Sequence, residues 1–81
     1  MSTEDERRIH GEAQRRIDRT ERLVKQIEPR RLADDQQQSL LTIQSFLAKA
    51  KEALSDKDVQ RAMTLADKAY FLADELARGL K

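Results

Sequence analysis

Apolar residues recur every three or four positions along most of this chain, which is the spacing of one face of an α-helix. The first such stripe runs through residues 4–28, with successive steps of four, four, three, four and three residues. Its members are Ile9, Ala13, Ile17, Thr20, Val24 and Ile27. Pro29 ends this helix, because proline has no N–H to donate and disfavours the helical conformation of the residue before it.

A second helix is predicted over residues 34–54, where Asp34 can act as N-cap with Gln37 in capping-box spacing. Its apolar stripe consists of Leu40, Ile43, Leu47, Ala50 and Leu54. The stripe is widened by Leu41, Phe46 and Ala53. A stripe of this width can touch two neighbours at once, so we expect this helix to be the central one.

A third helix is predicted over residues 57–78, after a polar turn in which Ser55 and Asp58 stand in capping-box spacing and Asp56 is an alternative cap. Its stripe consists of Val59, Ala62, Ala66, Ala69, Ala73, Leu76 and Leu80. The four alanines favour a close approach to the second helix. Gly79 is the expected C-cap, because glycine adopts left-handed dihedral angles at low cost.

Three helices of similar length with short connections predict an all-α fold, namely a three-helix antiparallel up-down-up bundle with a long first helix. The chain has 81 residues, with 38% charged residues and only two glycines and one proline. It is therefore expected to be a single helical domain over residues 1–81, or a fragment of a longer protein. The first helix can pack within the chain, or it can pair between chains as a strand of a coiled coil.

No group of residues in the sequence predicts catalysis or metal binding. There is no cysteine, and His10 is the only histidine. A single imidazole without a partner at suitable spacing forms neither a metal site nor a catalytic triad. Adjacent acids such as Asp34 and Asp35 point about 100° apart on a helix, so they do not converge as acid and base. We therefore expect a non-enzymatic protein with no cofactor, no metal site and no small-molecule substrate.

The sequence predicts a cytoplasmic protein as written. No stretch approaches the ~20 consecutive apolar residues of a membrane span. Residues 1–6 are polar and acidic, unlike the basic start and apolar run of a signal peptide. If the chain is a fragment of an exported protein, the expected location becomes the periplasm or the cell envelope.

Arginine is concentrated in the first helix. Residues 1–31 hold eight of the ten arginines, whereas the net charge of the whole chain is only +1. The candidate anion- or nucleic-acid-binding residues are Arg15, Arg16, Arg19 and Arg22. Acids interleaved with them at helical spacing predict that much of this charge is paired, which argues against nucleic acid as a partner. Arg16 falls within the apolar stripe, so it should snorkel to solvent or pair with an acid on another helix.

Large apolar residues beside the stripes are candidates for an interface. They are Phe71, Leu65, Leu72, Leu41 and Phe46. In one interpretation the first helix covers Leu65 and Leu72 and leaves Phe71 as a single exposed side chain, which needs no functional explanation. In the other, Phe71 forms a patch with Leu41 or Phe46 that docks a protein partner or a second copy of the chain.

Small residues are regularly spaced on both sides of the second connection. They form the patterns Ala50-x-x-Ala53-Leu54 and Ala62-x-x-x-Ala66-x-Lys68-Ala69, with a polar turn from Asp56 to Asp58 between them. This segment, residues 46–76, resembles one helix-turn-helix unit of tetratricopeptide-like repeats, although the tryptophan, glycine and proline positions of the repeat are missing. It is also similar to short helical hairpins of bacterial envelope proteins of unknown function.

The tetratricopeptide resemblance implies protein binding on a helical surface. Together with the residue patterns, it predicts a non-enzymatic helical scaffold or protein–protein interaction module, with self-association as one form of that activity. The alternative function is nucleic-acid or anion binding through the arginine-rich first helix.

Overall fold

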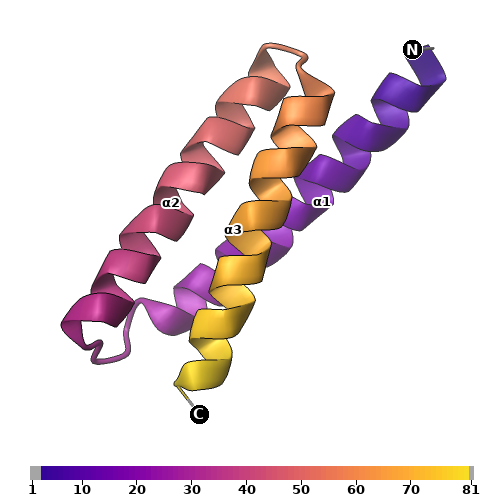
Figure 1. The fold of residues 1–81 in the computed structure, drawn as a ribbon. Helices are drawn as coiled ribbons and strands as arrows, with labels where there is room; N and C mark the ends of the chain where they lie inside the picture. The colour runs from indigo at the N-terminus through magenta and orange to yellow at the C-terminus, as the bar shows by residue number, and fades with distance from the viewer. Residues whose placement is uncertain (1–2, 81) are drawn as a thin grey trace.

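The computed structural model describes residues 3–80, which form three α-helices joined by short connections (Figure 1). α1 spans Thr3–Ile27, α2 spans Asp34–Ser55 and α3 spans Val59–Gly79. α1 and α3 run in the same direction and α2 runs in the opposite one. The bundle is an elongated rod of 45 × 18 × 15 Å. The predicted all-α, three-helix up-down-up bundle is confirmed.

The central helix is α3, and the prediction that the second helix would be central is wrong. α3 packs against both α1 and α2, whereas α1 and α2 make few contacts with each other. In Figure 1, α2 and α3 lie side by side while α1 crosses behind α3 at an angle. The physical reason is side-chain size, since small residues let two helices approach one backbone closely. The fully buried alanines of α3 are Ala62, Ala66, Ala69 and Ala73.

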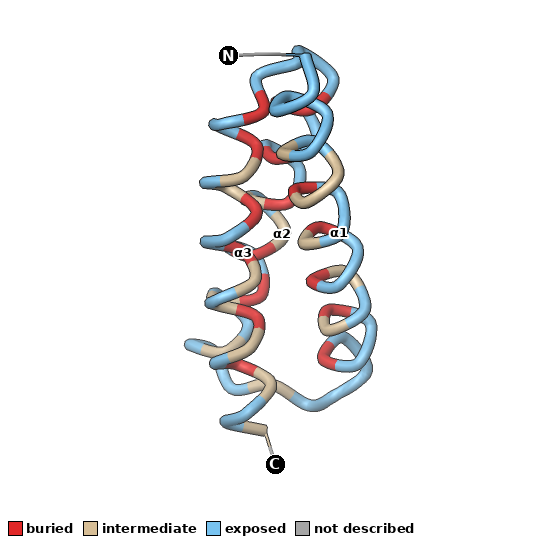
Figure 2. Tube along the Cα trace, turned by 90° about the vertical axis from the view of Figure 1, so that its right-hand side faces the viewer, coloured by how far each residue is buried: buried red, intermediate tan, exposed pale blue. Residues whose placement is uncertain are grey.

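Larger aliphatic side chains of α1 and α2 fill the space beside this alanine surface. Figure 2 shows the buried positions of α1 and α3 turned toward the interior of the bundle. Ile17, Ile27 and Ile43 are among the largest side chains that are fully buried. Thr20 is also fully buried, and its hydroxyl donates a hydrogen bond of 2.7 Å to the carbonyl of Arg16. That bond offsets the cost of removing the hydroxyl from water.

Polar contacts at the surface connect α1 to α2. Lys51 of α2 forms an ion pair with Glu21 of α1. Just after the C-terminal end of α1, Nε2 of Gln44 donates to Oε2 of Glu28 at 3.4 Å. Surface contacts of this kind contribute little to stability. α1 is therefore held in place mainly by its packing against α3.

The first connection begins one residue earlier than predicted, because α1 ends at Ile27. α2 is capped at Ala33, whose backbone N–H donates to Oε1 of Gln36 at 2.8 Å. This is the reciprocal half of a capping box, and alanine supplies no side-chain acceptor for the other half. The predicted pair of Asp34 and Gln37 is thus wrong by one residue. Asp34 lies in the first turn, where a negative charge is favourable at the helix N-terminus.

The second connection ends α2 with a left-handed residue. Lys57 has a φ of 61°, its N–H donates to the carbonyl of Leu54 at 3.0 Å, and the N–H of Asp58 donates to the carbonyl of Ala53 at 2.9 Å. This pair of bonds is a Schellman motif, which satisfies carbonyl groups that the end of a helix leaves without partners. The motif occupies Lys57 and therefore delays the start of the next helix.

α3 begins at Val59, two residues later than predicted, and its N-cap is Asp58 rather than Ser55 or Asp56. One carboxylate oxygen of Asp58 accepts from the backbone N–H of Arg61 at 3.3 Å. At the other end Gly79 remains helical, and the C-cap is Leu80 with a negative φ. The predicted glycine cap is wrong, because this end of α3 does not use a left-handed residue.

Replacing Ala66 with leucine should lower the free energy of unfolding by about 1–3 kcal/mol, because the added atoms have no space between α3 and its two neighbours. Urea denaturation followed by circular dichroism measures this loss. Ala48→Leu makes the same change at an exposed position of α2 and should alter stability by less than about 0.5 kcal/mol. Equal stability of the two variants would contradict the central position of α3.

Candidate interaction surfaces

An exposed aromatic residue lies on the outer side of α3. Phe71 is 62% exposed, and it follows Lys68 by three positions, so the two side chains are neighbours on the helix surface. Nζ of Lys68 lies 6.0 Å from the ring centroid of Phe46 on α2. Phe71, Lys68 and Phe46 therefore follow one another across the boundary between α3 and α2.

Leu65 and Leu72 share a row of α3 with Lys68, because the three residues are spaced three and four positions apart. Both leucines are partly buried and pack against the core. Since Lys68 lies over Phe46, this row faces α2, and the interpretation that the first helix covers the two leucines is wrong. We refer to these five residues as the aromatic face: Phe46, Leu65, Lys68, Phe71 and Leu72.

Leu41 does not belong to the aromatic face. It is 51% exposed, but it precedes Phe46 by five residues, which places it about 140° away around α2. Its neighbours one turn away are polar, at Gln37, Gln38, Gln44 and Ser45. Leu41 is therefore an isolated exposed apolar side chain.

Charged residues form two rows beside Phe71. Lys68 and Glu75 are seven residues apart and occupy the flank toward α2, whereas Asp67 and Asp74 occupy the flank toward α1. Both of these aspartates have partners within the chain. Asp67 lies 3.6 Å from Nε of Arg16, and Asp74 lies 2.9 Å from a guanidinium nitrogen of Arg78.

The arginine that falls in the apolar stripe of α1 is held by α3. Besides its ion pair with Asp67, the guanidinium carbon of Arg16 lies 5.2 Å from the ring centroid of Tyr70. The guanidinium carbon of Arg19 lies 5.3 Å from the same centroid. Of the two alternatives predicted for Arg16, the structure shows the pairing with an acid on another helix. The role of Tyr70 in holding two arginines could not be found from the sequence, because it depends on the contact between α1 and α3.

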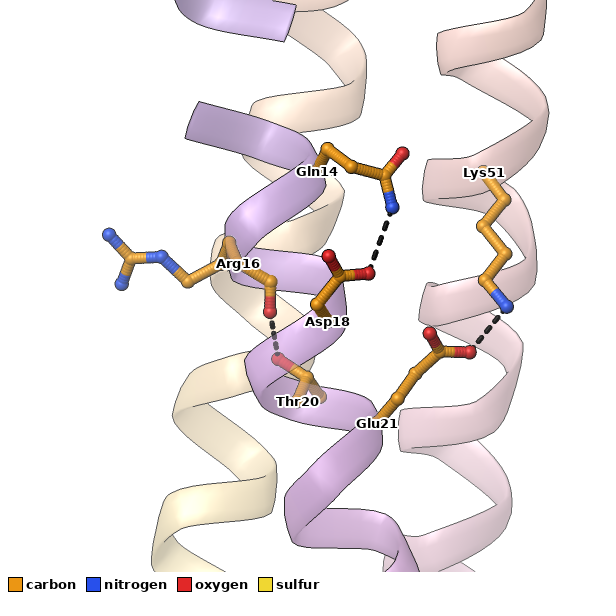
Figure 3. A network of polar contacts seen from close by, with 6 residues as sticks. All are labelled: Gln14, Arg16, Asp18, Thr20, Glu21 and Lys51. Carbon is orange, nitrogen blue, oxygen red and sulfur yellow. Dashed lines mark hydrogen bonds and ion pairs between the residues drawn. The ribbon is translucent and has the colours of Figure 1, made fainter. Parts of the chain in front are cut away.

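Two acids of α1 that stand between the arginines are bound to other residues. Figure 3 shows that Asp18 accepts from Nε2 of Gln14, at 3.0 Å, and that Glu21 pairs with Lys51 of α2. The side chain of Arg16 extends to the opposite side of α1, away from both acids. The spacing along the helix suggested that these acids pair with the arginines, but in the structure they are bound to Gln14 and Lys51.

Three of the four candidate anion-binding residues lie in one exposed row of α1. Arg15, Arg19 and Arg22 are spaced four and three residues apart, and we refer to them as the arginine row. Within residues 3–80, no carboxylate forms an ion pair with any of the three. Together with Asp18 they line a shallow depression on the surface. Arg16 borders the row on the flank of α1 that faces α3, and it lines a second depression with Glu12, Arg15 and Arg19.

The part of the chain that the structure describes contains no cluster of three His, Asp or Glu side chains that could hold a metal ion. His10 is exposed near the start of α1. None of the described helices has both the length and the apolar character required to cross a membrane.

Comparisons with known proteins add no further identification. No family model matches the chain, and neither does a curated protein or a solved structure. The assignment of a function therefore depends on the geometry of the aromatic face and the arginine row.

Replacing Tyr70 with leucine should lower the free energy of unfolding by about 1 kcal/mol, because each exposed cation–π contact contributes roughly 0.5–1 kcal/mol. Tyr70→Phe keeps the ring and is the matched control, with an expected change below about 0.5 kcal/mol. Urea denaturation measures both variants. A loss of the same size in Tyr70→Phe would assign the effect to the hydroxyl and would contradict the ring contacts.

Proposed function

We propose that this protein is a non-enzymatic helical scaffold that binds protein through its aromatic face, and that the first occupant of this face is a second copy of the chain. The observation that carries the proposal is the 62% exposure of Phe71, whose neighbour Lys68 lies over the partly buried Phe46. Contiguous exposed apolar residues commonly mark an interface. The resemblance of residues 46–76 to a tetratricopeptide-like hairpin also implies protein binding on a helical surface.

The arrangement of charges around Phe71 favours a second copy with its α3 antiparallel to the first. In such a dimer a two-fold axis passes next to Phe71, in the plane of the interface and perpendicular to α3. A residue three positions before Phe71 in one copy then lies near the residue four positions after Phe71 in the other copy. Lys68 then meets Glu75 of the second copy, and the symmetry repeats this pair. On the other flank Asp67 would approach Asp74, but each is already paired with an arginine of its own chain.

This interface is expected to be weak. Full burial of a phenylalanine side chain contributes about 1.5–3 kcal/mol, and each exposed ion pair contributes about 0.2–1 kcal/mol. Association also costs translational and rotational freedom, which offsets part of this gain. The degree of association should therefore depend on concentration within the range that solution measurements reach.

Replacing Phe71 with serine should convert a concentration-dependent dimer into a monomer, because it removes the apolar centre of the interface. Light scattering across a series of protein concentrations measures the mass of each variant. Leu41→Ser is the matched control, since it changes an exposed leucine outside the aromatic face and should leave the dimer unchanged. A wild-type chain that is monomeric at every concentration would refute the second copy as occupant.

Reversing the charge of Lys68 should weaken the dimer, because Lys68→Glu places two acids against each other at both symmetry-related positions. The double variant Lys68→Glu with Glu75→Lys exchanges the charges and should restore association. Sedimentation equilibrium of the two variants tests the antiparallel arrangement. Failure of the double variant to recover, with its helical content unchanged, would show that Lys68 and Glu75 do not meet across the interface.

A further inference from the structure

The structure assigns a second binding surface to the exposed side of α1: we infer that the arginine row binds the phosphate backbone of a duplex nucleic acid, without reading its sequence. This surface lies on a different helix from the aromatic face and does not depend on the proposed function. The interleaved acids argue against nucleic acid when the sequence alone is considered, and the ion pair of Glu21 with Lys51 takes one of these acids away from the arginines.

Within residues 3–80, none of the three guanidinium groups of the arginine row is held by a carboxylate, although that of Arg19 lies over the ring of Tyr70. Glu21 is neutralised by Lys51, and Asp67 is neutralised by Arg16. Two acids remain beside the row: Asp18, which accepts from the neutral amide of Gln14, and Glu12, which lines a depression with Arg15 and Arg19. Three arginines and these two acids leave a local charge of +1, concentrated on one side of α1.

The spacing of the row suits a regular polyanion. Arg15 and Arg22 are seven residues apart, which corresponds to about 10 Å along the helix axis. One strand of a duplex advances about 3.4 Å per phosphate, so the row spans roughly three phosphates. Guanidinium groups can bind phosphate oxygens with two parallel hydrogen bonds, which makes arginine well suited to this contact.

The composition of the outer side of α1 favours nucleic acid over an acidic protein. Positions three or four residues apart form a continuous line along this side of the helix. They are Arg8, Gly11, Arg15, Arg19, Arg22 and Gln26. Stable protein interfaces have an apolar or aromatic centre from which charged residues are depleted, and this line has no apolar side chain. A phosphate backbone, in contrast, can be bound by electrostatic contacts alone.

The position of Tyr70 favours a duplex over a single strand. Proteins that bind single strands offer aromatic rings on which bases stack. Tyr70 is the ring closest to the arginine row, and the guanidinium groups of Arg16 and Arg19 already lie over it. Binding is therefore expected through phosphates, with no preference for base sequence.

Fluorescence anisotropy with a labelled DNA duplex of about 20 base pairs tests the inference, using Phe71→Ser as background so that self-association makes no contribution. Three phosphate contacts predict a slope of about −2.7 for log K against log salt, which is a loss of affinity of roughly 40-fold between 50 and 200 mM KCl. Replacing Arg15, Arg19 and Arg22 together with glutamine should bring the slope close to zero.

Two further variants distinguish a site from general attraction between charges. Replacing Lys49, Lys57 and Arg61 with glutamine removes the same number of positive charges from exposed positions outside α1 and should leave the slope near −2.7. Asp18→Asn removes one of the two acids beside the row and should tighten binding. Circular dichroism of every variant verifies that the helices are retained.

The inference is overturned if the duplex does not bind in 50 mM KCl, or if the control triple variant loses as much affinity as the arginine variant. Binding of poly-glutamate at equal or higher affinity than the duplex would overturn it as well, and would assign the row to an acidic protein. None of these results bears on the aromatic face, because the background variant has already lost Phe71.

Discussion

The close contact of α3 with both of its neighbours is the packing interaction on which the rest of this structure depends. Alanine makes it possible, since its single methyl group fills little of the space between two backbones. α1 and α2 both pack on the alanine surface of α3, so the inner side of α3 is buried and its outer side is exposed to solvent. The exposure of Phe71 follows from this arrangement, because the residue lies on the side of α3 that neither neighbour can reach.

The same arrangement determines the charges on α1. Because α1 and α2 do not pack closely, their facing edges are joined by polar side chains, among them Glu21 and Lys51. The flank of α1 toward α3 is occupied by the contacts of Arg16 with Asp67 and Tyr70. Of the acids interleaved with these arginines, Glu21 is engaged by a neighbouring helix, whereas Asp18 is bound within α1. The balance of charge along the arginine row therefore depends on tertiary structure as well as on local sequence.

Apolar spacing could predict the three helices because a periodic stripe is a property of each helix alone. The choice of the central helix could not be predicted, because a wide stripe on α2 and an alanine surface on α3 both fit that role. Helix ends were displaced by one or two residues where Ser55, Asp56 and Asp58 compete as caps within a single short turn. For the surfaces, the exposure of Phe71 was open to prediction. The helix that covers Leu65 could not be predicted, because this requires knowing which helices are in contact.

The placement of α3 between the other two helices also has a consequence for the order of folding. α2 and α3 are joined by a short turn, so their contacts close small loops at low entropic cost. Contacts of α1 with α3 must instead join residues far apart in sequence, such as Arg16 and Asp67, which lie 51 positions apart. Contacts between distant residues form more slowly. We therefore expect the hairpin to assemble first and α1 to dock last, so that local opening of the native bundle begins with the release of the helix that carries the arginines.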